Sequence, residues 1–357
     1  MTEDSQPGTI RWRLAADEMV ADALFPDETA VQRHVGTGEY RGMEFYEVNA
    51  KRVINQVPKA SQMPFDYTIN PYRGCSHACI YCFARPTHEY LGLGIGEDFD
   101  RKFVVKVNAV ERTASELRSR RWSGAPIAMG TNTDPYQKAE GKYHLTRGII
   151  EALGQARNPF SILTKSTLVL RDLDVLTAAA SRTDVRLNMS IGTLDRDVWK
   201  LSEPGTPPPE KRVDAVRRLN DAGIPCGVLI APVLPGLSDT DDQLHEIVDA
   251  CVGAGAVSIS AISLHLRPGV REHYMAWLAR ERPDLVPLYD ELFTGRSGRR
   301  AYQPKARQEA LSQRVHRLVR AAEGRFGPPR TMRGVERREP DPIPSDPAVE
   351  QLSMLEG

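Results

Sequence analysis

The sequence predicts an α/β fold, a partial (β/α)6 TIM-like barrel, because short apolar segments recur along the chain and longer helical patterns separate them. Apolar segments typical of buried strands lie at 67–70, 126–130, 159–165, 185–191, 225–231 and 256–264. Patterns typical of amphipathic helices lie between them, at 108–121, 143–157, 170–181, 208–222 and 240–253. Because the strand segments are continuously apolar, we expect a parallel sheet buried on both faces. Six such units predict an open or partial barrel.

Two helix starts carry local signals. Asn108 is followed three residues later by Glu111, a pattern that resembles a capping box. Three prolines, residues 207–209, lie at the start of the helical pattern at 208–222, and Gly223 follows it. Proline at a helix start and glycine after its end are the preferred positions of these residues, so this pattern predicts both boundaries.

The chain divides into four predicted regions. Residues 1–64 are expected to form an N-terminal leader that is irregular or contains small β elements, and residues 65–270 the barrel core. Residues 271–325 have an apolar pattern typical of a helical C-terminal extension. Residues 326–357, rich in Pro, Arg and Asp, are expected to be a flexible tail.

The composition is that of a folded protein in a reducing compartment. Of 357 residues, 41% are apolar and 26% charged, far from the composition of disordered chains. No apolar stretch reaches the roughly 18 residues of a membrane helix, and the N-terminal residues do not resemble a signal peptide. Five cysteines, an odd number with three of them close together, favour metal chemistry over disulfides. We therefore expect a cytoplasmic protein without a membrane segment.

Charge is unevenly distributed although the formal net charge is zero. From Arg267 to Arg338 there are 17 Lys or Arg against 8 Asp or Glu. Such a segment can bind the phosphates of DNA or RNA. It can equally be a solvated, arginine-rich helical surface, since the basic residues are scattered and match no nucleic-acid-binding motif.

Cys75, Cys79 and Cys82 form a CxxxCxxC motif just after the first predicted strand. Three thiolates on one short loop can bind three irons of a [4Fe-4S] cluster and leave the fourth iron without a protein ligand. The alternative is a zinc site, which needs a fourth ligand, and the candidates nearby are His77 and His88. Zinc sites usually contain a second CxxC pair, and the sequence has none.

The cysteine spacing, with Tyr81 before the last cysteine, resembles the cluster motif of the radical S-adenosylmethionine (SAM) superfamily. Four segments resemble the DNA repair photolyase-like subgroup, which is related to spore photoproduct lyase. They are RGCSHACIYCFAR, TNTDPYQKAEGKYHLTRGIIEAL, FSILTKSTLVLRDLDVL and LSEPGTPPPEKRVDAVRRLNDAGIP. The resemblance covers about 66–270 and implies a barrel of the radical SAM type. It also implies a [4Fe-4S] cluster that splits SAM into methionine and a 5′-deoxyadenosyl radical, which abstracts hydrogen from a substrate.

The resemblance further implies contacts for SAM at the carboxyl ends of the strands. Gly130, Thr131 and Asn132, after the second strand, would meet the methionine amino group. Lys165 and Ser190, at the ends of the third and fourth strands, would meet its carboxylate. Read from the residues alone, 130–132 is also an ordinary strand-to-helix turn, and a lone lysine is usually on the surface.

Other polar residues receive weaker assignments. Tyr81 is expected against the adenosyl portion of SAM, and Glu203 and Arg212 could orient polar groups or simply cap and solvate a helix. Asp134 and Tyr136, in the loop after the second strand, could contact substrate, although Asp before Pro is also ordinary turn chemistry.

One departure from the family pattern affects the reaction. Spore photoproduct lyase uses an additional cysteine after the second strand as hydrogen donor, and the turn here aligns Thr131 with it. The remaining cysteines, Cys226 and Cys251, are expected to be small buried hydrophobes. The sequence therefore identifies no catalytic residue for thymine-dimer repair.

Three functions remain open from the sequence. The first is a radical enzyme, lyase-like or modifying, that acts on nucleic acid and takes electrons from a reductant such as a flavodoxin or ferredoxin. The second is a radical enzyme acting on a peptide or small metabolite. The third is a non-enzymatic zinc-binding adaptor.

Overall fold

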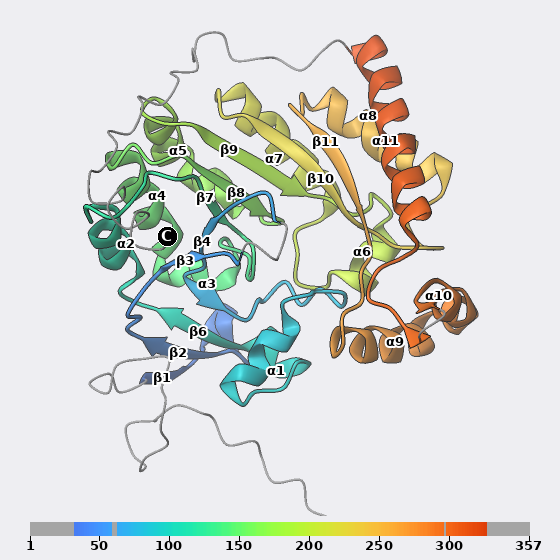
Figure 1. The fold of residues 1–357 in the computed structure, drawn as a ribbon, viewed down its shortest axis with the longest axis horizontal. Helices are drawn as coiled ribbons and strands as arrows, with labels where there is room; N and C mark the ends of the chain where they lie inside the picture. Colours follow the sequence, from blue (N-terminus) through green and yellow to red (C-terminus); the bar gives the residue numbers. More distant parts are fainter. Residues whose placement is uncertain (1–31, 59–62, 296–297, 327–357) are drawn as a thin grey trace, which may run out of the picture.

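The computed structural model describes residues 32–58, 63–295 and 298–326. Within them, the largest sheet has seven strands in the spatial order β11-β10-β9-β8-β7-β4-β3 (Figure 1). Neighbouring strands from β4 to β11 are parallel, and β3 pairs antiparallel with β4 at one edge. The strands are β3 Ile54–Gln56, β4 Tyr67–Ile69, β7 Ile127–Met129, β8 Phe160–Thr164, β9 Val185–Ser190, β10 Cys226–Val233 and β11 Ile259–Ser263.

The six predicted strands are the six parallel strands of this sheet, and each lies within three residues of its predicted bounds. Their spatial order follows their order in the chain, and no pairing joins β11 to β3 among the described residues. The sheet is therefore an open, partial (β/α)6 barrel, which confirms the predicted fold class.

The prediction that the strands are buried on both faces is wrong for β8, β9 and β11. In these strands buried residues alternate with half-buried or exposed ones. Ile162 and Leu187 lie in the main hydrophobic core, whereas their neighbours Leu163 and Asn188 are only half-buried. Successive side chains point to opposite faces, so helices cover one face and the other remains accessible.

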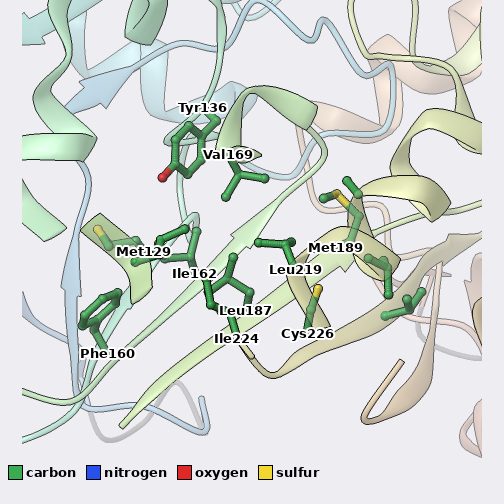
Figure 2. Packing of buried hydrophobic residues seen from close by; sticks show 14 of the residues in the cluster. Met129, Tyr136, Phe160, Ile162, Val169, Leu187, Met189, Leu219, Ile224 and Cys226 are labelled. Carbon is green, nitrogen blue, oxygen red and sulfur yellow. The ribbon is translucent and has the colours of Figure 1, made fainter. Parts of the chain in front are cut away.

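The covered face packs against helices that connect the strands. Their bounds are α2 Ala109–Leu117, α4 Leu145–Gln155, α5 Leu173–Ala180, α7 Pro209–Asp221 and α8 Asp241–Gly253. Shorter helices also lie in these connections. They are α3 Lys138–Tyr143, the 3-10 helix η4 Thr167–Asp172 and α6 Arg196–Ser202. Figure 2 shows Leu187 and Cys226 of the strands packed with Leu219 and Ile224, at the end of α7 and just beyond it. Burial of this apolar face is the main stabilising contribution to the barrel.

One helix boundary follows its local signal and one does not. Helix α7 begins at Pro209 and ends before Gly223, as predicted, and the φ of Gly223 is 80°. Asn108 does precede α2, but its side chain does not cap the helix. Instead Asn108 Oδ1 accepts a hydrogen bond from the Ala50 amide at 2.9 Å, and its Nδ2 donates to the Ala50 carbonyl at 3.1 Å. The tertiary contact replaces the predicted capping box.

A second sheet joins the N-terminal region to the core. It has the order β1-β2-β6-β5 within the described residues. Its strands are β1 Gln32–Val35, β2 Glu44–Val48, β5 Tyr72–Arg73 and β6 Lys102–Lys106, with η1 Gly38–Tyr40 and α1 Glu97–Arg101 in its connections. Because β2 pairs in parallel with β6, strands from the predicted leader and from the core share one sheet. Residues 1–31 and 59–62 of that leader lie outside the described residues.

The C-terminal extension is helical and contains one small hairpin. Its elements are α9 Val270–Glu281, η5 Pro283–Leu285, α10 Val286–Leu292, β12 Thr294–Gly295, β13 Gly298–Arg299 and α11 Lys305–Phe326. Helix α11 runs alongside α8 and β11, while α9 and α10 form a separate corner of the molecule (Figure 1). The predicted flexible tail lies outside the described residues except for Phe326. In the described part of the chain, no helix has both the length and the apolar character needed to span a membrane.

Candidate active site

The three clustered cysteines lie on a tightly folded loop, residues 74–84, between β5 and η3 (Arg85–Leu91). All three are free; Cys75 and Cys79 are buried, and Cys82 is half-buried. The loop begins at Gly74, whose φ is +78° and where a Cβ atom would lie 2.8 Å from the Lys102 carbonyl oxygen. Only glycine fits this turn without strain. We call residues 74–84 the cluster loop.

The segment after β7 holds the start of the cluster loop. Gln137 donates from Nε2 to the Gly74 carbonyl at 2.9 Å, and its Oε1 accepts from the Ser76 amide at 3.0 Å. Thr133 Oγ1 also donates to the Gly74 carbonyl, at 2.6 Å. Both side chains are buried, so these bonds fix the backbone around Cys75.

Arg85 holds the middle of the cluster loop through hydrogen bonds to its backbone. This fully buried side chain donates to the Cys79 carbonyl from Nε at 3.1 Å and from Nη2 at 3.0 Å. Its charge is matched by Asp100, 2.8 Å from Nη2, and its guanidinium lies over the Phe99 ring. Burial raises the pKa of Asp100 to about 6, although Arg85 acts in the opposite direction. Arg85 therefore orients Cys79 through its backbone.

A third segment, residues 202–205 at the end of α6 and just beyond it, closes the other side of the loop. The Ile80 amide donates to the Ser202 carbonyl, and the Gly205 amide donates to the His77 carbonyl, both at 3.0 Å. A Cβ atom on Gly205 would lie 2.0 Å from the Ser76 carbonyl oxygen, so this position requires glycine. The cluster loop is thus fixed on three sides before any cofactor binds.

The thiols of the loop suit a cluster better than a single ion. Burial raises the pKa of all three thiols. The negative charges of Asp134 and of the other two cysteines raise the pKa of Cys75 further. These buried thiols need a positively charged partner to ionise, which the irons of a cluster would provide. Among the described residues, no three His, Cys, Asp or Glu side chains are placed to share one metal ion. A [4Fe-4S] cluster instead presents a separate iron to each thiolate.

Neither histidine considered for a zinc site serves as a fourth ligand here. His77 Nδ1 lies 3.3 Å from Asp134 Oδ2, and His88 Nε2 lies 2.9 Å from the Lys102 carbonyl oxygen. Both side chains are buried and are used to hold the loop and its surroundings. The geometry therefore offers no support for a zinc site.

A buried network of charged residues lies beside the cluster loop, and it joins Lys165, Ser190 and Tyr81. Lys165 Nζ donates to Ser190 Oγ at 3.0 Å, to Glu203 Oε1 at 2.8 Å and to the Ala231 carbonyl at 3.3 Å. The same Nζ lies 5.5 Å from the centre of the Tyr81 ring, and Tyr81 donates its hydroxyl to Glu203 Oε1. Lys165 and Ser190 come from the ends of neighbouring strands on the accessible face of the sheet.

Glu203 is the centre of this network. Its Oε2 lies 2.6 Å from Arg212 Nη2, so one nearly inaccessible carboxylate balances two largely buried cations, Arg212 and Lys165. Burial by itself would raise the pKa of Glu203, but the two cations and the hydrogen bonds lower it well below its ordinary value. Arg212 also donates to the Ser190 carbonyl at 3.0 Å. Glu203 directly follows α6, and both its side chain and that of Arg212 are buried in this network, so neither side chain is solvated on a helix surface.

The residues after β7 take up positions beside the network. Gly130 has a φ of +88°, and a Cβ atom there would lie 1.9 Å from the Leu163 carbonyl oxygen. The Asn132 amide and the Thr131 hydroxyl both lie within hydrogen-bonding distance of Asn70 Oδ1, at 3.1 and 3.4 Å. Asn70 follows β4, so it links the ends of two neighbouring strands.

Asp134 and Tyr136 are structural in the free protein. Asp134 accepts hydrogen bonds from the Thr164 hydroxyl at 2.6 Å and the Lys165 amide at 2.7 Å, and it pairs with His77. Burial would raise the pKa of Asp134, but His77 and these hydrogen bonds lower it. Tyr136 is buried in the main core (Figure 2). Asp134 thus connects the cluster loop to the end of β8, which the sequence analysis did not foresee.

Replacing Gly130 tests whether this turn tolerates a side chain. We expect Gly130→Ala to lower the free energy of unfolding by more than about 2 kcal/mol, because it combines a positive φ with a clash against the backbone. Gly124→Ala is the matched control, since Gly124 also has a positive φ of +74° but has no atom within 4 Å of the added methyl. Urea unfolding of both variants measures the difference, and equal losses would contradict the predicted clash.

Cys226 and Cys251 lie away from this site. Both are buried in the main core, and burial raises the pKa of each thiol to about 12. Cys226 is the first residue of β10, at the end of the sheet opposite Lys165 and Ser190. The expectation that they are small buried hydrophobic residues agrees with these positions.

The chain thus folds as an open parallel barrel that carries three clustered free cysteines on a loop at the carboxyl ends of its strands. The family model of the radical SAM superfamily matches residues 69–250. The chain belongs to the radical SAM superfamily and is a radical SAM enzyme. The non-enzymatic zinc adaptor is excluded by this membership.

Two proteins similar in sequence and one solved structure similar in fold are compared with the chain. An uncharacterized protein of Mycobacterium tuberculosis (strain H37Rv) is 44% identical over 303 residues, 84% of this chain and 88% of the relative. A radical SAM Nα-GlyT isomerase of Pseudomonas phage M6 is 28% identical over 262 residues, 68% of this chain and 52% of the relative. A structure of spore photoproduct lyase complexed with dinucleoside spore photoproduct has a TM-score of 0.58 and 18% identity, with 80% of each chain covered. At that identity the structural likeness concerns the fold.

Proposed function

We propose that this protein holds a [4Fe-4S] cluster on Cys75, Cys79 and Cys82 and binds SAM beside it. We further propose that it abstracts hydrogen from a nucleic-acid substrate. The observation that carries the proposal is the preformed cluster loop, whose three free thiols lie next to the Lys165–Glu203 network at the carboxyl edge of the sheet. When bound, the cluster supplies the electron that cleaves SAM and so produces the radical that reacts with substrate.

The SAM contacts predicted from the sequence fit this proposal. Lys165 and Ser190 bring a cation and a hydroxyl to one point, where a carboxylate can accept from both. Glu203 already neutralises Arg212 as well as Lys165, so Lys165 can be shared with a second carboxylate without leaving Glu203 unpaired. Gly130, Thr131 and Asn132 would receive the amino group, and the Tyr81 ring would lie against the adenosyl portion.

The nucleic-acid part of the proposal rests on likeness to enzymes of the same fold. Spore photoproduct lyase has been solved with a dinucleoside photoproduct bound, and this chain shares its fold. The basic C-terminal segment adds little support. In its described part, most cations pair within the chain, for example Arg307 with Asp239, Arg314 with Asp241 and Arg325 with Asp249. That pairing favours a solvated surface over a phosphate-binding face.

Hydrogen abstraction is the step proposed here, and thiol-based return of hydrogen to the product is not part of it. Thr131, at the position aligned with the donor cysteine, is bound to Asn70. Cys226 and Cys251 are enclosed in the core. We propose that electrons come from a small reductant such as a flavodoxin or ferredoxin.

Anaerobically reconstituted protein tests the proposed function directly. Iron and sulfide content, electron paramagnetic resonance spectra after dithionite with and without SAM, and release of 5′-deoxyadenosine are the measurements. We expect about four irons per chain, a spectrum that changes on adding SAM, and 5′-deoxyadenosine release. Zinc without iron would refute the proposal. An active cluster that responds to a peptide or small metabolite, and not to DNA or RNA, would refute its nucleic-acid part.

Replacing Lys165 tests the SAM site separately from the cluster. We expect Lys165→Ala to raise the Kd for SAM by roughly 10- to 100-fold, because a charge-assisted hydrogen bond contributes about 1.5–3 kcal/mol. Iron content should be unchanged, since Lys165 is not a cluster ligand. Equilibrium dialysis with labelled SAM measures the affinity, and Lys200→Ala, at an exposed lysine of α6, is the control. An unchanged Kd would remove Lys165 from the SAM site.

A further inference from the structure

Three aromatic side chains form a row on the surface that begins in the cluster loop. Phe83 directly follows Cys82, His265 lies just beyond β11, and Tyr302 lies just before α11. The ring centroids of Phe83 and His265 are 5.9 Å apart. The rings of His265 and Tyr302 are stacked, with centroids 5.4 Å apart and planes 21° from parallel. We call these three residues the aromatic row.

The aromatic row presents open ring surface to solvent. Phe83 is 44% exposed and Tyr302 is 48% exposed, and both belong to the large hydrophobic side chains that the fold leaves uncovered. Exposure of one such residue is ordinary, but contiguous exposed rings beside an active site indicate a binding surface. The row begins one residue from a cluster-binding cysteine, so a group bound on it is next to the site of chemistry.

Backbone contacts hold the row in place. His265 and Tyr302 face each other across an isolated antiparallel bridge. The Leu266 amide donates to the Ala301 carbonyl at 2.7 Å, which fixes the same two segments. The rings are thus arranged before a ligand arrives, so stacking on them loses little conformational entropy.

The positively charged side chain of Arg267 lies beside the aromatic row and is available to a ligand. Arg267 is exposed, and its Nη2 donates to the Tyr302 hydroxyl at 3.1 Å. No carboxylate of the described residues forms an ion pair with Arg267, in contrast to Arg307 and Arg325 on α11. Burial and the nearby Arg267 charge both lower the pKa of His265, so at neutral pH His265 presents a neutral ring.

We propose that the aromatic row stacks an unpaired nucleobase and that Arg267 binds the adjoining phosphate. This inference rests on the proposed function and specifies its substrate as single-stranded or locally unpaired nucleic acid. Every base has a flat face that stacks on aromatic rings, and an arginine without an acidic partner attracts phosphate. A base inside a duplex is covered on both faces, so it must leave the helix before it can lie on the row.

Binding of labelled oligonucleotides tests the proposal without depending on the radical reaction. Fluorescence anisotropy would compare three ligands of about 12 nucleotides, a length within the range of single-strand sites. They are a thymidine oligomer, the same backbone without bases, and a duplex hairpin. The proteins would be the reconstituted wild type, Phe83→Ala, Tyr302→Ala, Tyr302→Phe and Arg267→Ala. Tyr90→Ala is the control, because Tyr90 is 70% exposed and lies outside the row.

We expect Phe83→Ala and Tyr302→Ala to weaken thymidine-oligomer binding by roughly 5- to 100-fold each, because each removes a stacking surface. Tyr302→Phe should keep most of the affinity, and Tyr90→Ala all of it. Arg267→Ala should reduce the dependence of log affinity on log salt by about 0.7, the effect of one lost phosphate contact on a single strand. The two ring-removing variants should leave this salt dependence unchanged.

The proposal would be overturned by wild-type affinity in both ring-removing alanine variants, by equal binding of the base-free backbone, or by equal binding of the duplex. Circular dichroism would show that each variant is folded. Iron content and 5′-deoxyadenosine release of the wild type, measured without oligonucleotide, separate this proposal from the proposed function. If the wild-type protein cleaves SAM but binds no thymidine oligomer, the base-stacking role of the aromatic row is refuted and the proposed function is not. A wild type without iron refutes the proposed function, while the binding data still decide the row.

Discussion

Replacing any one of the three cluster cysteines by alanine is expected to abolish SAM cleavage. Cys79→Ala is the most informative, because Cys79 lies at the centre of the loop and is held through its carbonyl by Arg85. Its removal leaves two thiolates for a cluster that the fold presents with three, so we expect iron to fall to background after reconstitution and desalting. Release of 5′-deoxyadenosine should fall by at least about 1,000-fold, since nothing else in the site supplies the electron.

The matched control for this experiment is Cys226→Ala. Cys226 is an equally buried free thiol, but it lies in the apolar core at the opposite end of the sheet (Figure 2). Its replacement leaves a small cavity and should lower the free energy of unfolding by about 1 kcal/mol, with iron content and SAM cleavage retained. If Cys226→Ala lost iron as Cys79→Ala does, the assignment of the cluster to the loop at 74–84 would be wrong.

The second large effect is expected at Glu203. Glu203→Gln keeps the shape of the side chain but removes the charge that balances Lys165 and Arg212. Breaking a buried ion pair from one side typically costs about 3–5 kcal/mol, because the remaining charges stay buried. We expect a loss of that size in the free energy of unfolding, measured with urea. Glu210→Gln, which breaks the exposed pair with Arg196, should cost no more than about 1 kcal/mol.

The Glu203 effect should depend on pH in a defined direction. In the folded protein the pKa of Glu203 lies below its ordinary value of 4.5, chiefly because Arg212 and Lys165 overcome the effect of burial. The charged carboxylate therefore stabilises the fold fully above pH 4.5, and this contribution declines as the pH falls below that value. Glutamine does not titrate, so the difference between wild type and Glu203→Gln should narrow on acidification. A difference that stayed constant from pH 7 to about pH 3 would show that charge is not the cause.

Much of the barrel could be predicted because its signals are local. Each parallel strand is a short apolar run, and the prolines before α7 and the glycine after it mark that helix. Strand β6 was missed because its partners, β2 and β5, come from other parts of the chain, and five residues after a short helix carry no pattern of their own. Asn108 shows the same limit, since a partner 58 residues away outcompetes its local capping role.

The candidate site also has parts that the sequence predicts and parts that only the folded chain brings together. The cysteines share one loop and were found by their spacing, whereas their supports come from distant segments. Gly205 looks like a residue of a proline-rich turn, and only the folded chain places it against Ser76. Lys165 was predicted to meet the carboxylate of SAM, but its contact with Glu203, 38 residues further on, could not be identified from spacing. The aromatic row likewise joins three separate segments and has no sequence motif.

The strand order of the large sheet bears on how the protein is made. From β4 to β11, each strand of the large sheet pairs with the strand of that sheet that precedes it in the chain, so the sheet can grow from one side as the chain leaves the ribosome. The cluster loop emerges early, yet its supports at Ser202 and Gly205 follow more than 100 residues later. The cysteines therefore spend much of translation without their enclosure. The thiols become enclosed, and so protected from oxidation, only after the later strands have joined the sheet.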